Sequence, residues 1–477
     1  MLFNSLEYFV FLPLLFLLYW SLGKKEIIWQ NILLLSASYF FYAWWSWKLL
    51  GLLAFSTILD YCYGFAVNTS KRKKALLFVW LSVINNLGIL AVFKYYNFFA
   101  AEFQILLTSL GWHANMQLLE LVLPIGISFY TFHGMSYVFD SYRGKIQPVR
   151  NLVDYSLFVS FFPLLVAGPI ERATHLIPQI QTKRIFNYHN ALIGCRMMVW
   201  GLFKKVILAD GLAPFADDCF ANYSDYNGST LLIGMIAFSF QIYCDFSGYS
   251  DIASGTAKLL GFNIVQNFNF PYFSKSIAEF WQKWHISLTS WFRDYLYIPL
   301  GGSKMGKWIT VRNTLIVFLL SGLWHGAQWH FIVWGLIHAL AFIPSVLLSK
   351  NTDNTSNKHS IFFKGLKVLL SFSFVCLAWT FFRADSVNSA IDYLTQTFSS
   401  LFSEPQQLLN APKNLIAFLF IIPIIIGDLI LKSSTSYRLF RFKLPLANYI
   451  AYLLLSVLII YGLFNGEAND AFIYFQF

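Results

Sequence analysis

Apolar runs long enough to cross a bilayer follow one another along almost the whole chain. A transmembrane helix needs about 20 mostly apolar residues. Expected spans lie near residues 6–22, 27–47, 49–67, 75–99, 118–139, 190–216, 229–257, 311–325, 329–349, 361–382, 413–431 and 446–463. The pattern predicts an all-α polytopic membrane protein of about a dozen spans. One membrane domain is expected over residues 1–477, with its core at about 118–349.

An amphipathic segment at residues 276–298 differs from these spans. Tryptophans and other apolar residues recur at helical intervals opposite polar ones. Ser276 and Glu279 have the spacing of a capping box, and Pro299 follows the segment. We therefore expect one helix that lies at the cytoplasmic interface with its tryptophans at headgroup level.

Two further segments are not simple spans. Residues 152–172 contain paired prolines and a glycine, which exclude one continuous helix and favour a re-entrant hairpin surrounded by protein. Within residues 321–330, Gly322 and Gly326 flank His325. These glycines predict close helix packing or a bent backbone at that histidine.

Composition excludes a water-soluble globule. The chain is 57% hydrophobic and only 12% charged, with a mean hydropathy of +0.57, whereas soluble domains carry about 25% charged residues. The net charge of +11 comes from short Lys and Arg clusters between apolar runs, which is typical of membrane orientation signals rather than of nucleic-acid binding. These clusters face the cytoplasm if the N-terminus lies outside. The first apolar run is expected to be a span rather than a cleaved signal peptide.

Two histidines are the main candidates for chemistry. His325 lies in an apolar run, where a histidine is costly to bury and usually functional. His285 lies in the amphipathic segment, and a histidine near neutrality can take a proton from a hydroxyl or thiol. The pair fits acyl transfer, although a structural histidine bonded to a carbonyl is the alternative. His330, His338 and His133 are interpreted as packing residues. No set has the close spacing that zinc prefers, so no metal is expected.

Polar residues also interrupt the apolar run at 229–257. They are Gln241, Asp245, Ser247, Tyr249 and Asp251. Intramembrane carboxylates are costly, so they imply a polar cavity or a partner. Asp245 is expected to pair with an arginine. The candidates are Arg143, Arg172 and Arg293. A structural network and a catalytic role are both open for this cluster.

Three motifs surround the two histidines. Residues 281–288 read Trp-Gln-Lys-Trp-His-Ile-Ser-Leu, residues 291–302 read Trp-Phe-Arg-Asp-Tyr-Leu-Tyr-Ile-Pro-Leu-Gly-Gly, and residues 322–326 read Gly-Leu-Trp-His-Gly. With these motifs the chain resembles the membrane-bound O-acyltransferase (MBOAT) family, in its bacterial alginate O-acetylase branch. Supporting similarity lies at 123–129, 162–163, 167–170, 245–251 and 379–384.

This resemblance implies a ring of tilted helices around a thinned centre, with funnels from both faces meeting near His325. It implies that His325 is a general base or transient acyl carrier and that His285 binds or polarises the donor or acceptor. The implied donor is cytoplasmic acetyl-CoA, with no tightly bound cofactor. The implied acceptor is an extracytoplasmic partner protein or a polysaccharide hydroxyl. Candidate substrate-binding residues are Lys283, Arg293, Asp245 and Trp324. The two basic residues equally fit lipid headgroups.

Two alternatives to acetyl transfer stay open. A related branch moves D-alanine or another acyl group to a cell-wall polymer, although residues 381–384 favour the acetylase branch. A transporter or scaffold for polysaccharide would also show broken helices and midplane polar groups. No internal duplication is evident around residue 240, which argues against a transporter. The expected location is the bacterial cytoplasmic membrane.

Overall fold

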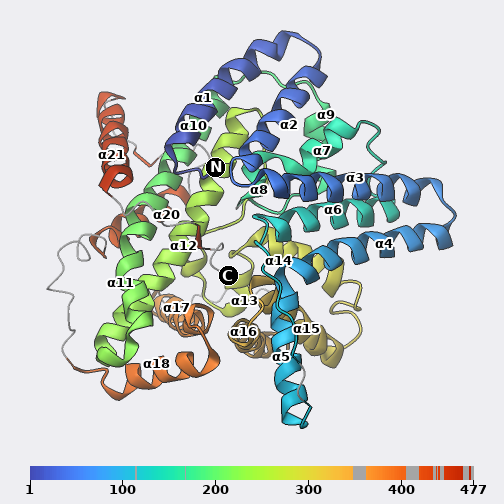
Figure 1. Cartoon of the computed structure of the whole chain (residues 1–477). Coiled ribbons are helices and arrows are strands. Elements are labelled where there is room, and N and C mark those ends of the chain that lie inside the picture. The colour runs from blue at the N-terminus through green and yellow to red at the C-terminus, as the bar shows by residue number, and fades with distance from the viewer. Residues whose placement is uncertain are drawn as a thin grey trace. The chain divides into compact units, whose positions relative to one another are not determined.

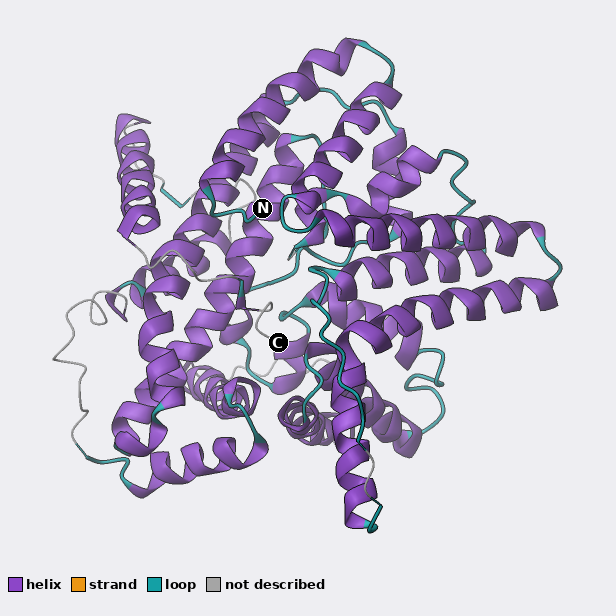
Figure 2. Ribbon diagram, in the orientation of Figure 1, coloured by secondary structure: helices purple, strands orange, loops and turns teal. Residues whose placement is uncertain are grey.

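Helices form all the regular structure of the described residues. The computed structural model describes residues 1–112, 115–166, 168–347, 361–403, 418–432, 437, 439–440, 445–465 and 472–473. Within these ranges Figure 2 shows helices and loops and no strand. The all-α prediction is therefore confirmed, while the ring of about a dozen spans stays a prediction.

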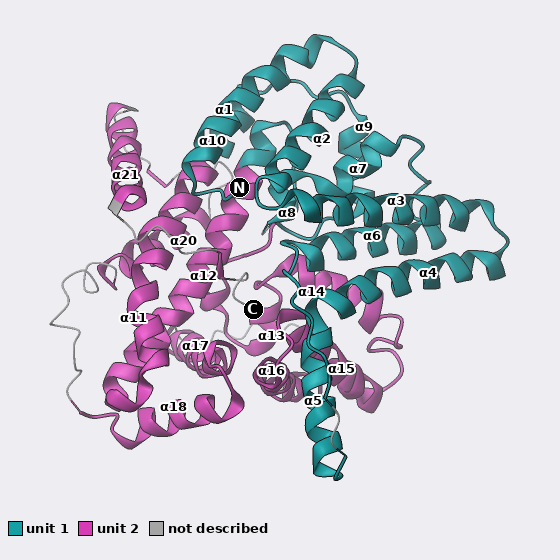
Figure 3. Ribbon diagram, viewed as in Figure 1, with its two compact units in different colours: residues 1–194, 256–265 teal, residues 195–255, 266–477 magenta. Residues whose placement is uncertain are grey.

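The chain divides into two compact units (Figure 3). Unit 1 comprises residues 1–194 and 256–265, and unit 2 comprises residues 195–255 and 266–477. Both expected histidines therefore belong to unit 2.

Unit 1 contains the N-terminal helices. They are α1 (Leu6–Ser21), η1 (Leu22–Lys24), α2 (Ile27–Ala43), α3 (Trp47–Thr69), α4 (Arg72–Leu90), η2 (Ala91–Tyr95), α5 (Tyr96–Ser109), α6 (Ile127–Tyr142), α7 (Leu152–Ser160), α8 (Phe162–Leu165), α9 (Ala173–Gln181) and the start of α10 (Tyr188–Leu202). Helices α3, α4 and α6 lie side by side (Figure 1). The expected span at 118–139 is wrong in its first part, because α6 begins only after Gly126. That glycine has φ +71°, and a Cβ on it would lie 2.1 Å from the Leu165 carbonyl oxygen.

The interruption expected at 152–172 is confirmed. Helix α7 ends at Ser160, and Phe161 leaves the helical region with φ −55° and ψ 111°. The short helix α8 then begins with a proline in its first turn, where a missing N–H has no cost. The Phe162 N–H, freed from the helix ladder, donates to the Ser38 hydroxyl at 3.1 Å.

Unit 2 contains the remaining helices. They are the end of α10, η3 (Phe203–Ala209), α11 (Asp210–Ala221), η4 (Tyr223–Asp225), α12 (Gly228–Leu259, whose last residues belong to unit 1), η5 (Pro271–Phe273), α13 (Ile277–Trp281), α14 (Ile286–Phe292), η6 (Arg293–Tyr297), α15 (Lys307–His325), α16 (Trp329–Leu347), α17 (Ile361–Arg383), α18 (Val387–Ser399), α20 (Ile421–Lys432) and α21 (Pro445–Asn465). The segments η3 and η6 are wound as π-helix, a form that is frequent at functional sites.

Seven helical stretches in the described part of the chain are long and apolar enough to span a membrane. They are Leu6–Lys24, Trp47–Thr69, Arg72–Ser109, Gly228–Leu259, Trp329–Leu347, Ile361–Arg383 and Leu446–Phe464. The protein is therefore an integral membrane protein. Other expected spans form shorter helices, such as the 17-residue α2. The C-terminal span expected at 413–431 is described only from residue 418.

Helices α15 and α16 form a closely packed hairpin whose contact depends on glycines. A Cβ on Gly322 of α15 would lie 2.2 Å from the Phe331 carbonyl oxygen, and one on Gly335 of α16 would lie 2.3 Å from the Phe318 carbonyl oxygen. Gly326 ends α15 in an extended conformation with φ −156° and ψ 148°. The close packing and the bent backbone expected around His325 are both confirmed.

We expect Gly322→Ala to destabilise this hairpin. Its methyl group would meet backbone rather than a mobile side chain, and overpacking of this kind costs about 1–3 kcal/mol. The matched control is Gly88→Ala in α4, where a Cβ meets no atom within 4 Å. Apparent melting temperature in detergent measures the difference. Equal melting of the two variants would contradict the role given to Gly322.

Candidate active site

His325 lies in an aromatic cage built by three helices of unit 2. It is the last residue of α15 and is 3% exposed. Its ring lies 5.2 Å from that of Trp334 in α16 and 5.3 Å from that of Phe382 in α17, both edge-to-face. The hairpin turn places the histidine there, because α15 stops at Gly326 and α16 returns alongside it. The cage restricts the imidazole to few orientations.

His285 occupies a turn between two short helices, so the single helix expected at 276–298 is wrong. Helix α13 ends at Trp281, α14 begins at Ile286, and His285 itself has φ +44°. A positive φ is uncommon for a residue with a Cβ and is costly unless neighbouring contacts hold it. Two backbone hydrogen bonds tie this turn to the preceding loop, from Ile286 N to Asn267 O at 2.9 Å and from Asn269 N to Lys283 O at 2.9 Å.

The tryptophans of this segment are buried inside the protein, so they do not form the exposed face that an interfacial helix presents to lipid headgroups. Trp281, Trp284 and Trp291 are 5%, 1% and 7% exposed. The expected N-cap is confirmed, because the Ser276 hydroxyl accepts from Glu279 N at 3.1 Å. Aromatic neighbours from other parts of unit 2, such as Trp379 against Trp284 at 5.0 Å, cover the face that the sequence pattern assigned to lipid.

The indole of Trp324 contacts both histidines. Its ring centroid lies 4.9 Å from that of His325 and 5.9 Å from that of His285. Trp324 is itself 5% exposed. The structure thus brings both sequence-predicted histidines to one aromatic side chain, which also was a candidate site residue.

The imidazole of His285 is enclosed and neutral. It is 0% exposed, and the ring of Phe246 meets it edge-on at 4.7 Å. Its Nδ1 lies 3.0 Å from the side-chain oxygen of Asn267. Burial lowers the pKa of His285 to about 3, so the ring carries no proton charge near neutral pH. A neutral imidazole has one nitrogen able to accept a hydrogen bond or a proton.

Asp245 pairs with a lysine, so the arginine partner expected from the sequence is wrong. The Lys205 Nζ lies 2.9 Å from Asp245 Oδ1 and 2.7 Å from Asp210 Oδ1. The second carboxylate oxygen of Asp245 accepts from Ile473 N at 2.7 Å. Both oxygens therefore bind protein groups, which favours the structural interpretation of this residue.

A second lysine extends the same buried network. Lys204 Nζ lies 2.5 Å from Asp251 Oδ2 and 3.0 Å from Ser247 Oγ. Sequence reasoning missed both lysines, because they sit inside an apolar run that was interpreted only as a span. The signal was available: two adjacent lysines in an apolar run need acidic partners, and α12 supplies Asp245 and Asp251.

The two basic candidates differ in their surroundings. Lys283 forms a 2.5 Å ion pair with Glu279 one turn earlier. Arg293 lies in η6 with its side chain 63% exposed and pairs with Asp294 at 2.9 Å. Arg293 lines a cavity of about 730 Å³ and Lys283 does not. A volume in this range accommodates a small-molecule ligand.

This cavity is lined by basic as well as apolar side chains. The basic lining residues are Arg293, Lys304 and Lys307, and the apolar ones include Leu288, Phe292, Val317, Phe318 and Phe342. Trp281 closes part of it, and the Trp281 ring lies 5.7 Å from that of Trp334, which contacts His325. A series of ring contacts through Trp281 and Trp334 therefore connects the wall of this cavity to His325.

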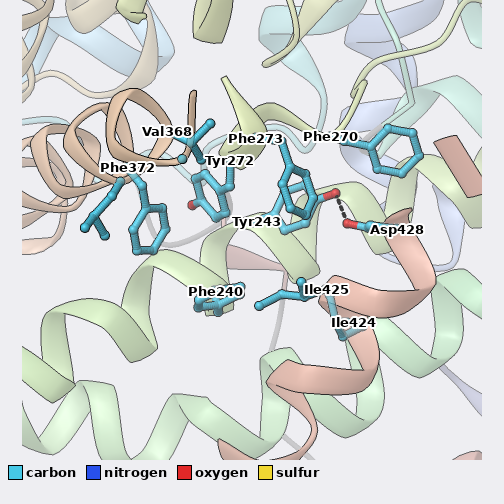
Figure 4. A pocket seen from close by; sticks show the side chains of 12 residues that line it. Phe240, Tyr243, Phe270, Tyr272, Phe273, Val368, Phe372, Ile424, Ile425 and Asp428 are labelled. Carbon is cyan, nitrogen blue, oxygen red and sulfur yellow. Dashed lines mark hydrogen bonds between the residues drawn. The ribbon is translucent and has the colours of Figure 1, made fainter. Parts of the chain in front are cut away.

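A smaller cavity lies elsewhere in unit 2 (Figure 4). It measures about 240 Å³ and is lined mainly by aromatic and aliphatic side chains of α12, α17, α20 and the loop around η5. The Tyr243 hydroxyl points toward Asp428 and donates to its Oδ2 at 2.6 Å. Neither candidate histidine lines this cavity.

His330, His338 and His133 are buried among protein neighbours, in agreement with their interpretation as packing residues. The two rings of the hairpin helix α16 are held by neighbours: His330 Nδ1 lies 2.9 Å from the Phe381 carbonyl oxygen, and His338 Nδ1 accepts from the Trp281 indole at 3.3 Å. In unit 1, His133 Nε2 accepts from Glu171 N at 3.0 Å. Among the described residues, no three His, Cys, Asp or Glu side chains gather as metal ligands.

Seven apolar helices of the described residues that are long enough to span a membrane, with two buried histidines that contact one tryptophan, define a polytopic membrane protein with an enclosed histidine cluster. The sequence profile of MBOAT, the membrane-bound O-acyltransferase family, matches residues 34–389. The chain belongs to this family and is an O-acyltransferase, which confirms the resemblance found in the motifs.

The names of individual relatives describe three different activities. The chain is 40% identical to the probable alginate O-acetylase AlgI of Azotobacter vinelandii over 398 residues, 83% of this chain and 76% of that protein. It is 37% identical to the peptidoglycan O-acetyltransferase of Helicobacter pylori over 424 residues, 83% and 79% of the two chains. It is 27% identical to the teichoic acid D-alanyltransferase of Bacillus subtilis over 276 residues, 55% and 69% of the two chains.

Proposed function

We propose that this protein transfers an acetyl group from cytoplasmic acetyl-CoA across the bacterial cytoplasmic membrane for O-acetylation of an extracytoplasmic polysaccharide. Alginate and peptidoglycan are the acceptor classes that the relatives' names suggest. The observation that carries the proposal is the enclosure of His325 and His285 around Trp324. Such an enclosure provides a base shielded from water, as acyl transfer requires.

His325 acts as the general base in this proposal. It takes the proton of the acceptor hydroxyl while the hydroxyl oxygen bonds to the acetyl carbonyl carbon. The bond from that carbon to the donor sulfur then breaks, and the thiolate leaves with the proton returned by His325. His325 as a transient acyl carrier is the second form of the same proposal: its nitrogen first takes the acetyl group from sulfur and then passes it to the hydroxyl.

His285 binds and orients the donor or the acceptor in this proposal. With a pKa lowered by burial to about 3, its role at neutral pH is that of a neutral, orienting group rather than an imidazolium. Trp324 contacts both rings and bounds the space that the acetyl group crosses. A rigid aromatic wall favours a short acyl chain. Each added methylene in the acyl group changes the free energy by which the enzyme discriminates between donors by about 1–3 kcal/mol.

The cavity lined by Arg293, Lys304 and Lys307 binds the phosphate groups of the donor. We expect Arg293→Gln to raise KM for acetyl-CoA about 3- to 10-fold, a modest effect because the side chain is exposed and screened. Lys283→Gln is the matched control and leaves KM unchanged, because Lys283 is paired with Glu279 and lies off the cavity. Steady-state kinetics at varied donor concentration measures both. If Arg293 contacts lipid headgroups instead, KM stays at the wild-type value.

The test of the proposed function uses full-length protein in lipid nanodiscs with acetyl-CoA labelled in its acetyl group. We expect time-dependent release of CoA and transfer of label to added oligosaccharide or to its partner protein. Labelled D-alanyl carrier protein serves as the competing donor. Movement of polysaccharide without any covalent change in it, or use of the D-alanyl donor alone, would contradict the proposal.

A further inference from the structure

Asn267 connects His285 to two other elements of unit 2. It lies in the loop that follows α12 and is 2% exposed. Its side-chain oxygen lies 3.0 Å from His285 Nδ1 and 2.9 Å from the Ser287 hydroxyl. Its side-chain nitrogen donates to the hydroxyl of Ser250 in α12 at 3.3 Å. One buried amide thus contacts the turn and α12 at the same time.

The hydrogen-bond pattern determines how this amide is oriented. The backbone N–H of Ser287 points at the same atom of Asn267, at 3.4 Å, and a backbone N–H can only donate. The atom that receives it must therefore be Oδ1, and the amide nitrogen faces Ser250. An exchanged orientation would set the NH₂ group of Asn267 against the Ser287 N–H.

This orientation also determines the tautomer of His285. Because Asn267 Oδ1 only accepts, His285 Nδ1 must carry the hydrogen that joins them. In a neutral imidazole the lone pair then resides on Nε2. Burial lowers the pKa of His285 to about 3, so the ring is neutral near pH 7 and the tautomer argument applies.

We propose that Asn267 is the positioning residue of His285, which it holds as the Nδ1–H tautomer so that Nε2 is the nitrogen that accepts a proton or hydrogen bond during acyl transfer. This inference rests on the proposed function. Asn267 also receives the Ile286 N–H on its backbone oxygen at 2.9 Å. The same residue therefore fixes both the strained backbone of the turn, at φ +44°, and the ring of His285.

Asn267→Leu tests the proposal, because leucine has a similar size and no acceptor. We expect kcat to fall at least about 10-fold, the lower end of what outer partners of functional histidines contribute, with KM for acetyl-CoA within about 3-fold of wild type. Ser250→Ala is the matched control, since it removes a partner of the same amide without touching His285. We expect the Ser250→Ala variant to keep kcat within about 2-fold of the wild-type value.

Asn267→Asp separates positioning from simple support of the fold. Its carboxylate still accepts from His285 Nδ1, so activity at high pH is retained. The added negative charge favours the imidazolium and raises the pKa of His285, so the acid limb of the pH profile of kcat moves to higher pH. A structural role would leave this profile in place.

Three results would overturn the inference. They are wild-type kcat in Asn267→Leu, an unshifted pH profile in Asn267→Asp, and loss of folded protein in both variants, which would make Asn267 a purely structural residue. Comparison with His325→Ala distinguishes this failure from failure of the proposed function. If His325→Ala keeps transfer, the proposed function fails. If His325→Ala loses transfer and Asn267→Leu keeps it, only the inference on Asn267 fails.

Discussion

Replacing His325 by alanine is expected to abolish acetyl transfer while leaving the protein folded in the membrane. The imidazole is the proposed base at the centre of the cage, and general base catalysis contributes about 10²- to 10⁴-fold. The cage itself consists of Trp324, Trp334 and Phe382, whose rings all contact that of His325, and Trp334 and Phe382 also contact each other. Transfer of labelled acetyl by the purified variant, and O-acetyl content of surface polysaccharide in cells that depend on it, measure the effect.

His330→Gln is the matched control for that experiment. His330 is a second buried histidine of the same hairpin, 3% exposed, and its ring bonds to the Phe381 carbonyl oxygen. Glutamine can keep that bond as a donor, so activity is expected to stay near wild type. Normal polysaccharide acetylation with His325→Ala present at wild-type abundance in the membrane would show that His325 is not the base.

The second large effect is expected for Lys205→Met. This lysine is 1% exposed and neutralises the carboxylates of Asp210 and Asp245. Removing one partner of a buried ion pair leaves an uncompensated charge and costs about 3–5 kcal/mol of folding free energy. We expect a lower apparent melting temperature and a reduced yield of detergent-purified protein. Activity per folded molecule is a separate measurement on the material that survives.

Two further variants make the Lys205 prediction specific. Lys205→Met combined with Asp245→Asn removes both charges of one pair, so it is expected to recover part of the lost stability. Lys145→Met is the control with a solvent-screened lysine, because Lys145 lies 3.6 Å from the buried Asp140 carboxylate but its own side chain is 52% exposed. We expect a smaller loss of stability than for Lys205→Met, because solvent screens an exposed charge. A Lys205→Met protein as stable as Lys145→Met would exclude the proposed role of the buried pair.

Local patterns were sufficient for much of the fold and for the identity of the candidate residues. Hydropathy alone predicted the helices that became α1, α3, α12, α16 and α17, because span length and apolar content are properties of a continuous stretch. Glycines beside His325 predicted the close hairpin, because a residue without a Cβ lets the backbones of two helices approach closely in any helix pair. Proline positions predicted the break after α7, because a proline inside a helix has no N–H to donate and its ring clashes with the preceding turn.

Predictions that depended on partners distant in sequence were less successful. The pattern at 276–298 favoured one lipid-facing helix, because periodicity shows an apolar face without showing what covers it. Buried aromatic residues from α16 and α17 cover that face, and Asn267 stabilises a left-handed turn at His285 that no local propensity favours. The lysine partner of Asp245 lies 40 residues away, in a different helix.

The sequence by itself determined that this is a membrane-bound O-acyltransferase with two candidate histidines, since membrane helices and family motifs are written in contiguous residues. Only the tertiary structure decided that both histidines meet the ring of Trp324, that Lys205 neutralises Asp245, and that Asn267 fixes the tautomer of His285. The physical reason is that each of these depends on contacts between separate elements, whose geometry is established when the helices pack and their buried polar groups find partners.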